Sequence, residues 1–252
     1  MELKSLCKEL NIEYYGITNT ETGSAIVCLF PYFNNFEKGN ISRYAAIPDY
    51  HMVCKQYLEK IAALFDCKSH IYADVSPYNE VELAQRAGLG IIGRNGLLIN
   101  EKYGSFVFIG LVVLEGMNIK PSTPLTGKCI ECDKCISSCP GKAISEKGIN
   151  TEKCLSHITQ KKGELSAFET ELILNNDTVW GCDICSDVCP HNKNVPETPI
   201  AQFRENIMAS ISEEDLENLS EREFKKKFFD RAFTWRGKKT LLRNLKIKNK
   251  TL

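Results

Sequence analysis

Cysteine is concentrated in one stretch of this 252-residue chain. Eight of its twelve cysteines lie between positions 129 and 189: Cys129, Cys132, Cys135, Cys139, Cys154, Cys182, Cys185 and Cys189. The chain begins with a charged amphipathic segment rather than a secretion signal, and no apolar run reaches the eighteen or so residues of a membrane helix. We therefore expect a cytoplasmic protein without a membrane partner, in a compartment that keeps thiols reduced. The cysteines then predict metal ligands instead of a disulfide framework.

The spacing of these cysteines indicates which metal group they hold. The first run reads C-x2-C-x2-C-x3-C-P, as in bacterial two-cluster ferredoxins, and a second Cys-Pro ends at Pro190. Eight thiolates suffice for two [4Fe–4S] clusters. The ferredoxin crossing rule predicts one cluster on Cys129, Cys132, Cys135 and Cys189, and the other on Cys139, Cys154, Cys182 and Cys185. The alternative is a pair of structural zinc sites, which require neither the triple run nor the two Cys-Pro endings.

Hydrophobic patterns upstream of the cysteines predict a mixture of helices and strands. Helical periodicity predicts helices over 2–11, 49–65 and 80–87, and continuous apolar runs predict strands over 24–30, 69–74 and 104–114. Residues 88–93 match G-x-G-x-x-G, but a helix precedes them and a strand follows, which is the reverse of the order in a dinucleotide site. The other four cysteines have apolar neighbours and are expected to be buried: Cys7, Cys28, Cys54 and Cys67.

The end of the chain is strongly basic, although the whole chain has a formal net charge of zero. Between positions 222 and 250 there are twelve Lys and Arg against two acidic residues, a local charge of +10. Four aromatic residues are interleaved with these charges: Phe228, Phe229, Phe233 and Trp235. This combination suits contact with phosphates and stacking on bases. The alternative is an ordinary solvated helix face.

Several ordered motifs outside the cysteines resemble the epoxyqueuosine reductases. They are Ser42-Arg-Tyr-Ala45, Asp49-Tyr-His51, Asp74-x-x-Pro77-x-x-Glu80, Ala84-Gln-Arg-Ala-Gly-Leu-Gly90, Gly104-Ser105, Trp235-Arg-Gly and Arg243-Asn244. In that family, as here, the motifs up to Gly104-Ser105 lead into two ferredoxin-type cysteine runs, and an Asn follows the last Cys-Pro two positions on. The resemblance spans most of residues 2–195. Because no helical-repeat tail follows Leu252, the chain resembles a short form of the family.

The resemblance implies an α+β fold, cofactors and a reaction. Residues 1–120 would form a nitroreductase-like α/β catalytic domain that binds cobalamin, 121–199 a double [4Fe–4S] ferredoxin-like domain that supplies electrons, and 200–252 a basic helical segment. The implied reaction reduces epoxyqueuosine to queuosine at the wobble position of tRNA, with the epoxide oxygen leaving as water. The implied partners are the anticodon region of tRNA and an external low-potential electron donor, and no DNA partner is expected.

The resemblance also implies roles for individual residues. Asp74 matches the family's proposed acid, and burial at a strand end beside an apolar corrin is expected to raise its pKa and favour the protonated form. The alternative is an exposed or helix-capping Asp. The candidates for corrin contacts are Arg43, Tyr44, Asn95, Gly104 and Ser105. For each of these five, a structural role in a loop is the alternative. The family binds cobalamin without a protein ligand to cobalt, so His51 is not assigned to the metal.

Two other functions are compatible with the same residues. The first is a cobalamin and iron–sulfur reductase of a small molecule, as in the reductive dehalogenases. The second is a non-enzymatic electron-carrier ferredoxin. Cobalamin binding would separate an enzyme from a carrier, and the state of queuosine-type tRNA after loss of the gene would separate the two substrates.

Overall fold

The computed structural model describes residues 2–249, which divide into two compact units. The first unit contains the chain up to Phe33, Tyr50–Cys132 and Pro190–Gln202, and the second contains Asn34–Asp49, Asp133–Cys189 and the chain from Phe203 onward. The domains expected from the sequence are consecutive stretches with boundaries at 120 and 199. The compact units instead alternate along the chain, so a cofactor-binding division at those boundaries stays a prediction.

An antiparallel sheet of four strands forms the centre of the first unit, in the order β1-β2-β6-β3. β2 pairs with β6 along its whole length, from Gly23 opposite Glu115 to Pro31 opposite Val107. The elements of this unit are α1 (Leu3–Glu9), β1 (Tyr15–Asn19), β2 (Gly23–Pro31), α3 (Tyr50–Ala62), β3 (Ser69–Ala73), α4 (Glu80–Arg86), β4 (Ile91–Ile92), β5 (Leu98–Ile99), β6 (Val107–Glu115) and the 3-10 helix η2 (Pro190–Asn192).

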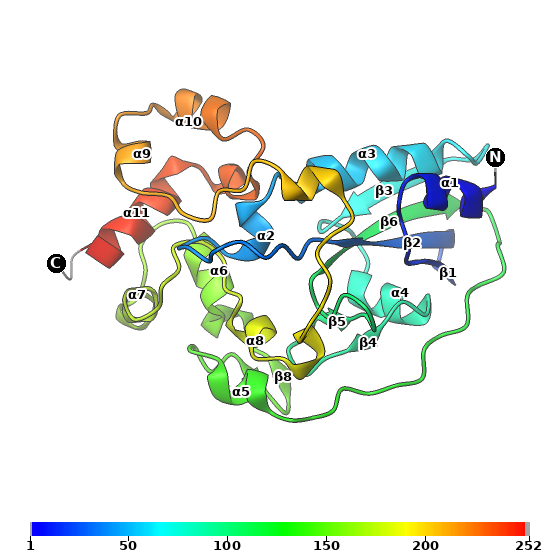
Figure 1. Cartoon of the computed structure of the whole chain (residues 1–252), viewed down its shortest axis with the longest axis horizontal. Coiled ribbons are helices and arrows are strands. Elements are labelled where there is room, and N and C mark those ends of the chain that lie inside the picture. The colour runs from blue at the N-terminus through cyan, green and yellow to red at the C-terminus, as the bar shows by residue number, and fades with distance from the viewer. Residues whose placement is uncertain (1, 250–252) are drawn as a thin grey trace. The chain divides into compact units, whose positions relative to one another are not determined.

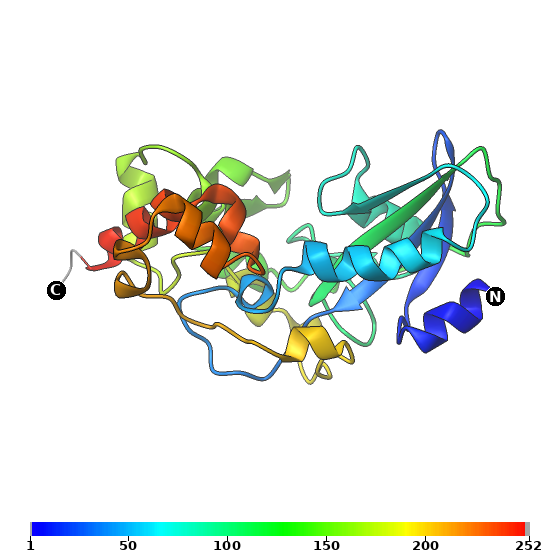
Figure 2. The same ribbon diagram turned by 90° about the horizontal axis from the view of Figure 1, so that it is seen from above.

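Helices cover both faces of this sheet, as Figures 1 and 2 show for α3 and α4. Alternate residues of β2 point to opposite faces, because successive side chains of a strand do so. On one face Val27 and Leu29 pack with Leu83 of α4. On the other face, Phe30 and Leu58 of α3 close over Gly110, where a Cβ atom would lie 2.7 Å from the Phe30 ring. β2 is buried on both faces, which explains its continuous apolar sequence.

The second unit is mainly helical. Its elements are α2 (Arg43–Ala46), α5 (Lys134–Ser138), β7 (Ile144–Ser145), β8 (Gly148–Ile149), η1 (Thr151–Lys153), α6 (Leu155–Gln160), α7 (Ala167–Leu174), α8 (Ile184–Asp187), α9 (Glu214–Glu217), α10 (Glu221–Lys227), η4 (Ala232–Arg236) and α11 (Lys238–Asn249), and a further 3-10 helix, η3 (Ala201–Arg204), crosses its boundary. An aromatic core contains Trp180, Phe224, Phe228 and Phe233, all of them buried.

Most elements expected from the sequence upstream of the cysteines are confirmed. The predicted helices correspond to α1, α3 and α4, and the predicted strands to β2, β3 and β6. Gly88 follows α4 with φ +78°, the left-handed conformation in which glycine ends helices, and 91–99 then forms the β4–β5 hairpin. The G-x-G-x-x-G match is therefore a helix stop and a hairpin. Among residues 2–249, no helix is long and apolar enough to cross a membrane.

Candidate active site and cluster-binding segment

Five of the eight clustered cysteines lie close together in the second unit. Ala143 and Ile144 are buried at the centre of this group. Around them pack Cys135, Cys139, Cys154 and Cys185. Cys182 belongs to the same group, because the thiols of Cys154 and Cys139 contribute to its electrostatic environment. All twelve cysteines are free thiols.

Cys139, Cys154, Cys182 and Cys185, the ligand set predicted for one cluster, lie in this group together with Cys135, which was predicted for the other cluster, so the ligand set stays a prediction. Burial raises the pKa of Cys182 to about 11, so this thiol is uncharged unless a bound metal favours the thiolate. Cys129 and Cys132 belong to the first unit, whereas Cys189 belongs to the second. The assignment of the other cluster to Cys129, Cys132, Cys135 and Cys189 remains a prediction.

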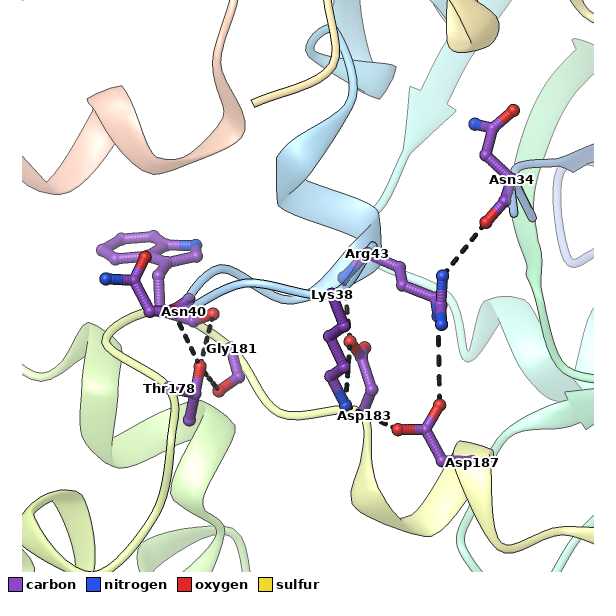
Figure 3. A network of polar contacts seen from close by, with 9 residues as sticks. Asn34, Lys38, Asn40, Arg43, Thr178, Gly181, Asp183 and Asp187 are labelled. Carbon is purple, nitrogen blue, oxygen red and sulfur yellow. Dashed lines mark hydrogen bonds and ion pairs between the residues drawn. The ribbon is translucent and has the colours of Figure 1, made fainter. Parts of the chain in front are cut away.

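A polar network connects residues 34–49 with the second cysteine run, and both segments belong to the second unit (Figure 3). Asp183, between Cys182 and Cys185, is 5% exposed and accepts the backbone N–H of Arg43 at 2.8 Å. Asp187 pairs with Lys38 at 2.5 Å. Burial raises the pKa of Asp183, and Lys38, 3.9 Å away, acts in the opposite direction. The network fixes the backbone around Arg43 beside this cysteine run.

Gly181 permits this close approach. Its φ is +75°, and a Cβ atom there would lie 1.9 Å from the hydroxyl oxygen of Ser42. Both the backbone conformation and the lack of space favour glycine immediately before Cys182. Thr178 strengthens the same contact, because its hydroxyl bonds to the carbonyls of Asn40 and Gly181 at 3.3 and 3.1 Å.

The two corrin candidates of the second unit make contacts within the protein. The guanidinium of Arg43 donates to the carbonyl of Asn34 at 3.0 Å, lies 3.9 Å from Asp187, and lies over the ring of Phe36. The hydroxyl of Tyr44 accepts from the amide of Gln160 at 3.2 Å. These contacts hold both side chains in place, and their roles as corrin contacts remain predictions.

The candidate acid and two corrin candidates of the first unit lie at one end of its sheet. Asp74 directly follows β3, and Gly104 and Ser105 directly precede the segment that enters β6. β3 and β6 are antiparallel, with Ala73 opposite Gly110, so the end of β3 and the start of β6 meet at the same edge. Tyr50, at the start of α3, stacks on Phe108 of β6 with ring centroids 4.0 Å apart. This places His51 at the same end of the sheet.

The setting of Asp74 differs from the expectation in its burial and its pKa. The strand β3 is only half-buried, and the Asp74 side chain is 61% exposed. A hydrogen bond to His51, whose Nε2 lies 3.5 Å from Asp74 Oδ2, lowers the pKa of Asp74, and Tyr50 lowers it further. Burial acts in the opposite direction but does not prevail. Asp74 is therefore exposed here, as in the alternative interpretation, and its protonation beside a bound corrin stays a prediction.

Glu80, which the sequence motif contains but to which no role was assigned, holds the backbone of Asp74. Asp74 has φ +76°, an uncommon conformation for a residue other than glycine. Its backbone N–H donates to Glu80 Oε2 at 3.2 Å. Glu80 Oε1 is buried and has no hydrogen-bond partner among residues 2–249, and burial raises the pKa of Glu80. The signal that was overlooked is the fixed spacing between the two acids in Asp74-x-x-Pro77-x-x-Glu80.

Asn192 is a second residue to which no role was assigned. Its amide bonds twice to Ser105, as an acceptor from the backbone N–H at 2.7 Å and as a donor to the hydroxyl at 2.9 Å. Gly104 has φ +56°, and a Cβ there would lie 2.0 Å from the Asn192 side-chain oxygen. Ser105 therefore binds Asn192, in the segment that follows the last cysteine, and Gly104 leaves room for the Asn192 side chain. The signal for this role was the Asn two positions after the final Cys-Pro.

Asn95 is a corrin candidate with an unsatisfied buried donor among the described residues. It is buried in the turn of the β4–β5 hairpin, and its side-chain oxygen accepts the backbone N–H of Leu97 at 3.4 Å. Its side-chain amide nitrogen is buried and has no hydrogen-bond partner in the described part of the chain. A buried donor of this kind is costly unless a ligand, ion or water completes it.

Two segments of the chain match known protein families. Residues 128–192 match the 4Fe-4S double cluster binding domain, and residues 18–76 match the domain described as Epoxyqueuosine reductase QueG. The epoxyqueuosine reductase of Lactococcus garvieae is 34% identical over 224 residues, which are 85% of this chain and 62% of the relative. That of Synechocystis is 34% identical over 203 residues, covering 75% of this chain and 68% of the relative.

A solved structure supports the same fold. The crystal structure of an epoxyqueuosine reductase with an epoxyqueuosine-modified tRNA-Tyr stem loop is 23% identical and has a TM-score of 0.84, covering 97% of this chain and 80% of that one. The cysteines and the α+β fold define an iron–sulfur protein with a double-cluster domain. The chain belongs to the epoxyqueuosine reductase family. It spans 62% and 55% of the length of the relatives from Lactococcus garvieae and Staphylococcus aureus.

Proposed function

We propose that this chain reduces epoxyqueuosine to queuosine in tRNA, with two [4Fe–4S] clusters and cobalamin as cofactors. The observation that carries the proposal is the presence in one chain of the epoxyqueuosine reductase domain and the double-cluster domain. Conversion of an epoxide to an alkene takes two electrons and two protons, and the oxygen leaves as water. The protein must therefore bind redox groups, hold a proton donor and admit an RNA base.

The donor set of the cysteine module fits iron–sulfur clusters. Each [4Fe–4S] cluster takes four thiolates, and the eight free cysteines between 129 and 189 match two of them. Within the second unit, Cys139, Cys154 and Cys185 pack with Ala143 and Ile144. Cys182 packs against the neighbouring buried cluster that contains Leu155 and Ile158, and it lies within electrostatic reach of Cys154 and Cys139. We assign these four to one cluster and the remaining four to the other.

Cobalamin is the cofactor of this family, and part of the predicted contact set fits it. When bound, it supplies the redox centre that acts on the substrate. Asn95 suits a corrin amide, because its buried side-chain nitrogen lacks a hydrogen-bond partner within residues 2–249. Asn192 occupies both the backbone N–H and the hydroxyl of Ser105, and we retain Ser105 and Gly104 as candidate contacts of the corrin. We retain Arg43 and Tyr44 as candidate contacts of the corrin.

Asp74 and His51 are the proposed source of a proton. His51 lies 3.5 Å from Asp74, and a carboxylate beside an imidazole favours the protonated ring, so His51 is the proposed reservoir of the proton. Asp74 is exposed and can reach the departing oxygen, whereas His51 can return a proton to Asp74. Asp74 is then the group that touches substrate, and His51 acts through it.

The proposed partners are tRNA, through its anticodon region, and an external low-potential electron donor. The solved relative that contains a modified stem loop supports the choice of RNA. We propose the cytoplasm as the location, because tRNA is modified there.

The proposal is tested by anaerobic reconstitution of the full chain with iron, sulfide and cobalamin. The loaded protein is chemically reduced and incubated with tRNA that carries epoxyqueuosine, and the nucleosides are then analysed by mass spectrometry. We expect a product lacking one oxygen. Protein that binds all three cofactors and leaves the epoxide intact would contradict the proposal.

Asp74→Asn is the matched variant for the proton donor. It should keep iron, sulfide and cobalamin content at the wild-type level while conversion falls by about a hundredfold or more. Full conversion by this variant would remove Asp74 from the reaction but leave the overall function standing.

A further inference from the structure

A basic groove lies on the surface of the second unit, formed by the region before α7, by α10 and by η4 with α11. Its volume is about 550 Å³. We call it the Trp235 groove, and it is lined by Lys162, Gly163, Glu221, Lys225, Trp235, Arg236, Gly237, Lys239, Thr240 and Arg243. Five lining side chains are cationic and one is acidic, so the groove carries a formal charge of +4.

Three of these cations are available to a ligand. Lys162, Lys225 and Lys239 are exposed, and their side chains make no hydrogen bond or ion pair with the residues that the structure describes. The single acid, Glu221, accepts the backbone N–H of Lys238 through Oε2 at 3.3 Å. Arg243 differs from the three lysines because it donates to the carbonyls of Lys161 and Gly163 and so shapes the wall of the groove.

Trp235 gives the groove an aromatic surface. Its side chain is 59% exposed, although tryptophan elsewhere in the chain, at Trp180, is fully buried. The guanidinium of Arg236 lies 3.6 Å from the ring centroid of Trp235 and supports one face of the indole. Arg236 Nε is buried without a hydrogen-bond partner among residues 2–249. An exposed indole supported from one side presents its other face for stacking.

We propose that the Trp235 groove is a single-stranded RNA site, in which one unstacked base lies on Trp235 and neighbouring phosphates contact Lys225, Lys239 and Lys162. Single-stranded RNA has both a π-face for the indole and phosphates for the lysines. An acidic peptide would satisfy only the lysines. The choice of RNA rests on the proposed function, which it deepens by locating a binding surface for the RNA.

The structure narrows which basic and aromatic residues of the C-terminal segment can serve this role. Phe228 and Phe233 are buried in the aromatic core and are unavailable for stacking. The ammonium group of Lys238 donates to the carbonyl of Leu219 and Arg243 donates to two carbonyls, so both are structural. Within the basic C-terminal segment, the proposed RNA contacts are therefore limited to Lys225, Trp235 and Lys239.

The test measures RNA binding by the full chain without requiring catalysis. The probe is a fluorescein-labelled anticodon stem-loop RNA without the modified base, followed by fluorescence anisotropy over a range of salt concentrations. Trp235→Leu should weaken binding about fivefold or more through loss of one stacked base. Lys225→Ala combined with Lys239→Ala should reduce the slope of log affinity against log salt by about 1.4, since each single-strand phosphate contact contributes about 0.7.

Two matched controls separate the groove from general surface effects. Phe229→Leu removes an aromatic side chain that is 64% exposed and does not line the groove. Lys4→Ala combined with Lys60→Ala makes the same change in net charge on the first unit. Both controls should bind the RNA as the wild type does.

The outcomes distinguish this inference from the proposed function. Equal losses in the groove variants and in their controls, or unchanged binding in the groove variants, would overturn the RNA site while leaving epoxide reduction possible. Selective loss in the groove variants supports the site even if the loaded protein fails to reduce epoxyqueuosine. AMP is the second probe, and competition by AMP as strong as by an equal nucleotide concentration of the RNA would indicate a mononucleotide site instead.

Discussion

At the scale of single residues, the pKa of Asp74 depends more on its hydrogen-bond partners than on its burial. His51 is the largest influence and lowers the pKa of Asp74, while Glu80 holds the backbone N–H of the same residue. The hydrogen bond to His51 stabilises the folded chain above the pKa that Asp74 has when unfolded. This contribution to the free energy of unfolding is lost as the pH falls through the lowered pKa of folded Asp74. It is small because the Asp74 side chain is exposed.

His51→Ala should raise the pKa of Asp74, because it removes the partner that favours the carboxylate. The measurement is a pH titration of side-chain carboxyl carbons by NMR in isotope-labelled protein. His70→Ala is the matched control, since His70 lies 2.6 Å from Glu115 and lowers the pKa of that residue. An unchanged Asp74 titration in His51→Ala would refute the pairing.

Glu80→Leu should release the backbone at Asp74, whereas Glu80→Gln should retain it, since a side-chain amide oxygen can still accept the Asp74 N–H. The expected cost of the Leu variant is about 1 kcal/mol of local stability, with faster exchange of amide hydrogens over 73–80. Hydrogen-exchange mass spectrometry measures this. Glu82→Leu removes an exposed acid of the same helix and should leave the exchange rates unchanged.

At the scale of elements, α11 is attached to the rest of the second unit by a buried amide. Asn244 is fully buried, and its side-chain nitrogen donates to the carbonyls of Thr159 and Val179 at 2.7 and 2.8 Å. This connects α11 with the end of α6 and with the segment before the second cysteine run. The Arg243-Asn244 motif is therefore structural in this chain, with both side chains satisfying backbone carbonyls.

Asn244→Ala should destabilise the folded chain by roughly 2–4 kcal/mol, because it leaves two buried carbonyls without a donor. Asn244→Asp should cost a similar amount, since a carboxylate cannot donate to either carbonyl. Thermal unfolding monitored by circular dichroism measures both. Asn249→Ala, at the exposed end of α11, should change stability by less than about 0.5 kcal/mol; equal effects at the two positions would contradict this account.

The elements were predictable where one pattern dominates. β2 is buried on both faces and α3 has a periodic apolar face, so the sequence identifies both. β1 was not predicted, because its five residues are one tyrosine, one glycine, one isoleucine and two polar residues, which give no clear alternation of apolar and polar side chains. The depth of Asp74 could not be predicted, since the exposure of a strand end depends on what packs beside it and not on the strand's own sequence.

At the scale of the whole molecule, the cysteine spacing identified the cofactor class, and the ordered motifs identified the family. The position of Asn192 after the last Cys-Pro marks this residue, but its partner and the partner of Asp183 could not be derived from spacing, because each contacts a residue more than eighty positions away. Long-range pairs of this kind leave no periodic signal in the sequence. The burial of Phe233 was hidden for the same reason, since its partners include the distant Trp180.

Cys154→Ser should lower the iron content of the anaerobically purified chain from about eight to about four atoms, because one of two [4Fe–4S] clusters loses a thiolate. Acid-labile sulfide should fall in parallel. Cys54→Ser, which changes a buried thiol of the first unit outside the cysteine module, should keep the full iron content. Zinc in place of iron and sulfide in the wild type would contradict the cluster assignment.

The alternation of the two units along the chain governs the order of events during synthesis. The second unit needs residues 34–49, 133–189 and those beyond 203, so its early segment leaves the ribosome long before its partners exist. The cysteines emerge while the aromatic core that depends on Phe224 and Phe233 is still being translated. Insertion of iron and sulfide into a folded second unit must therefore follow translation of the basic end of the chain.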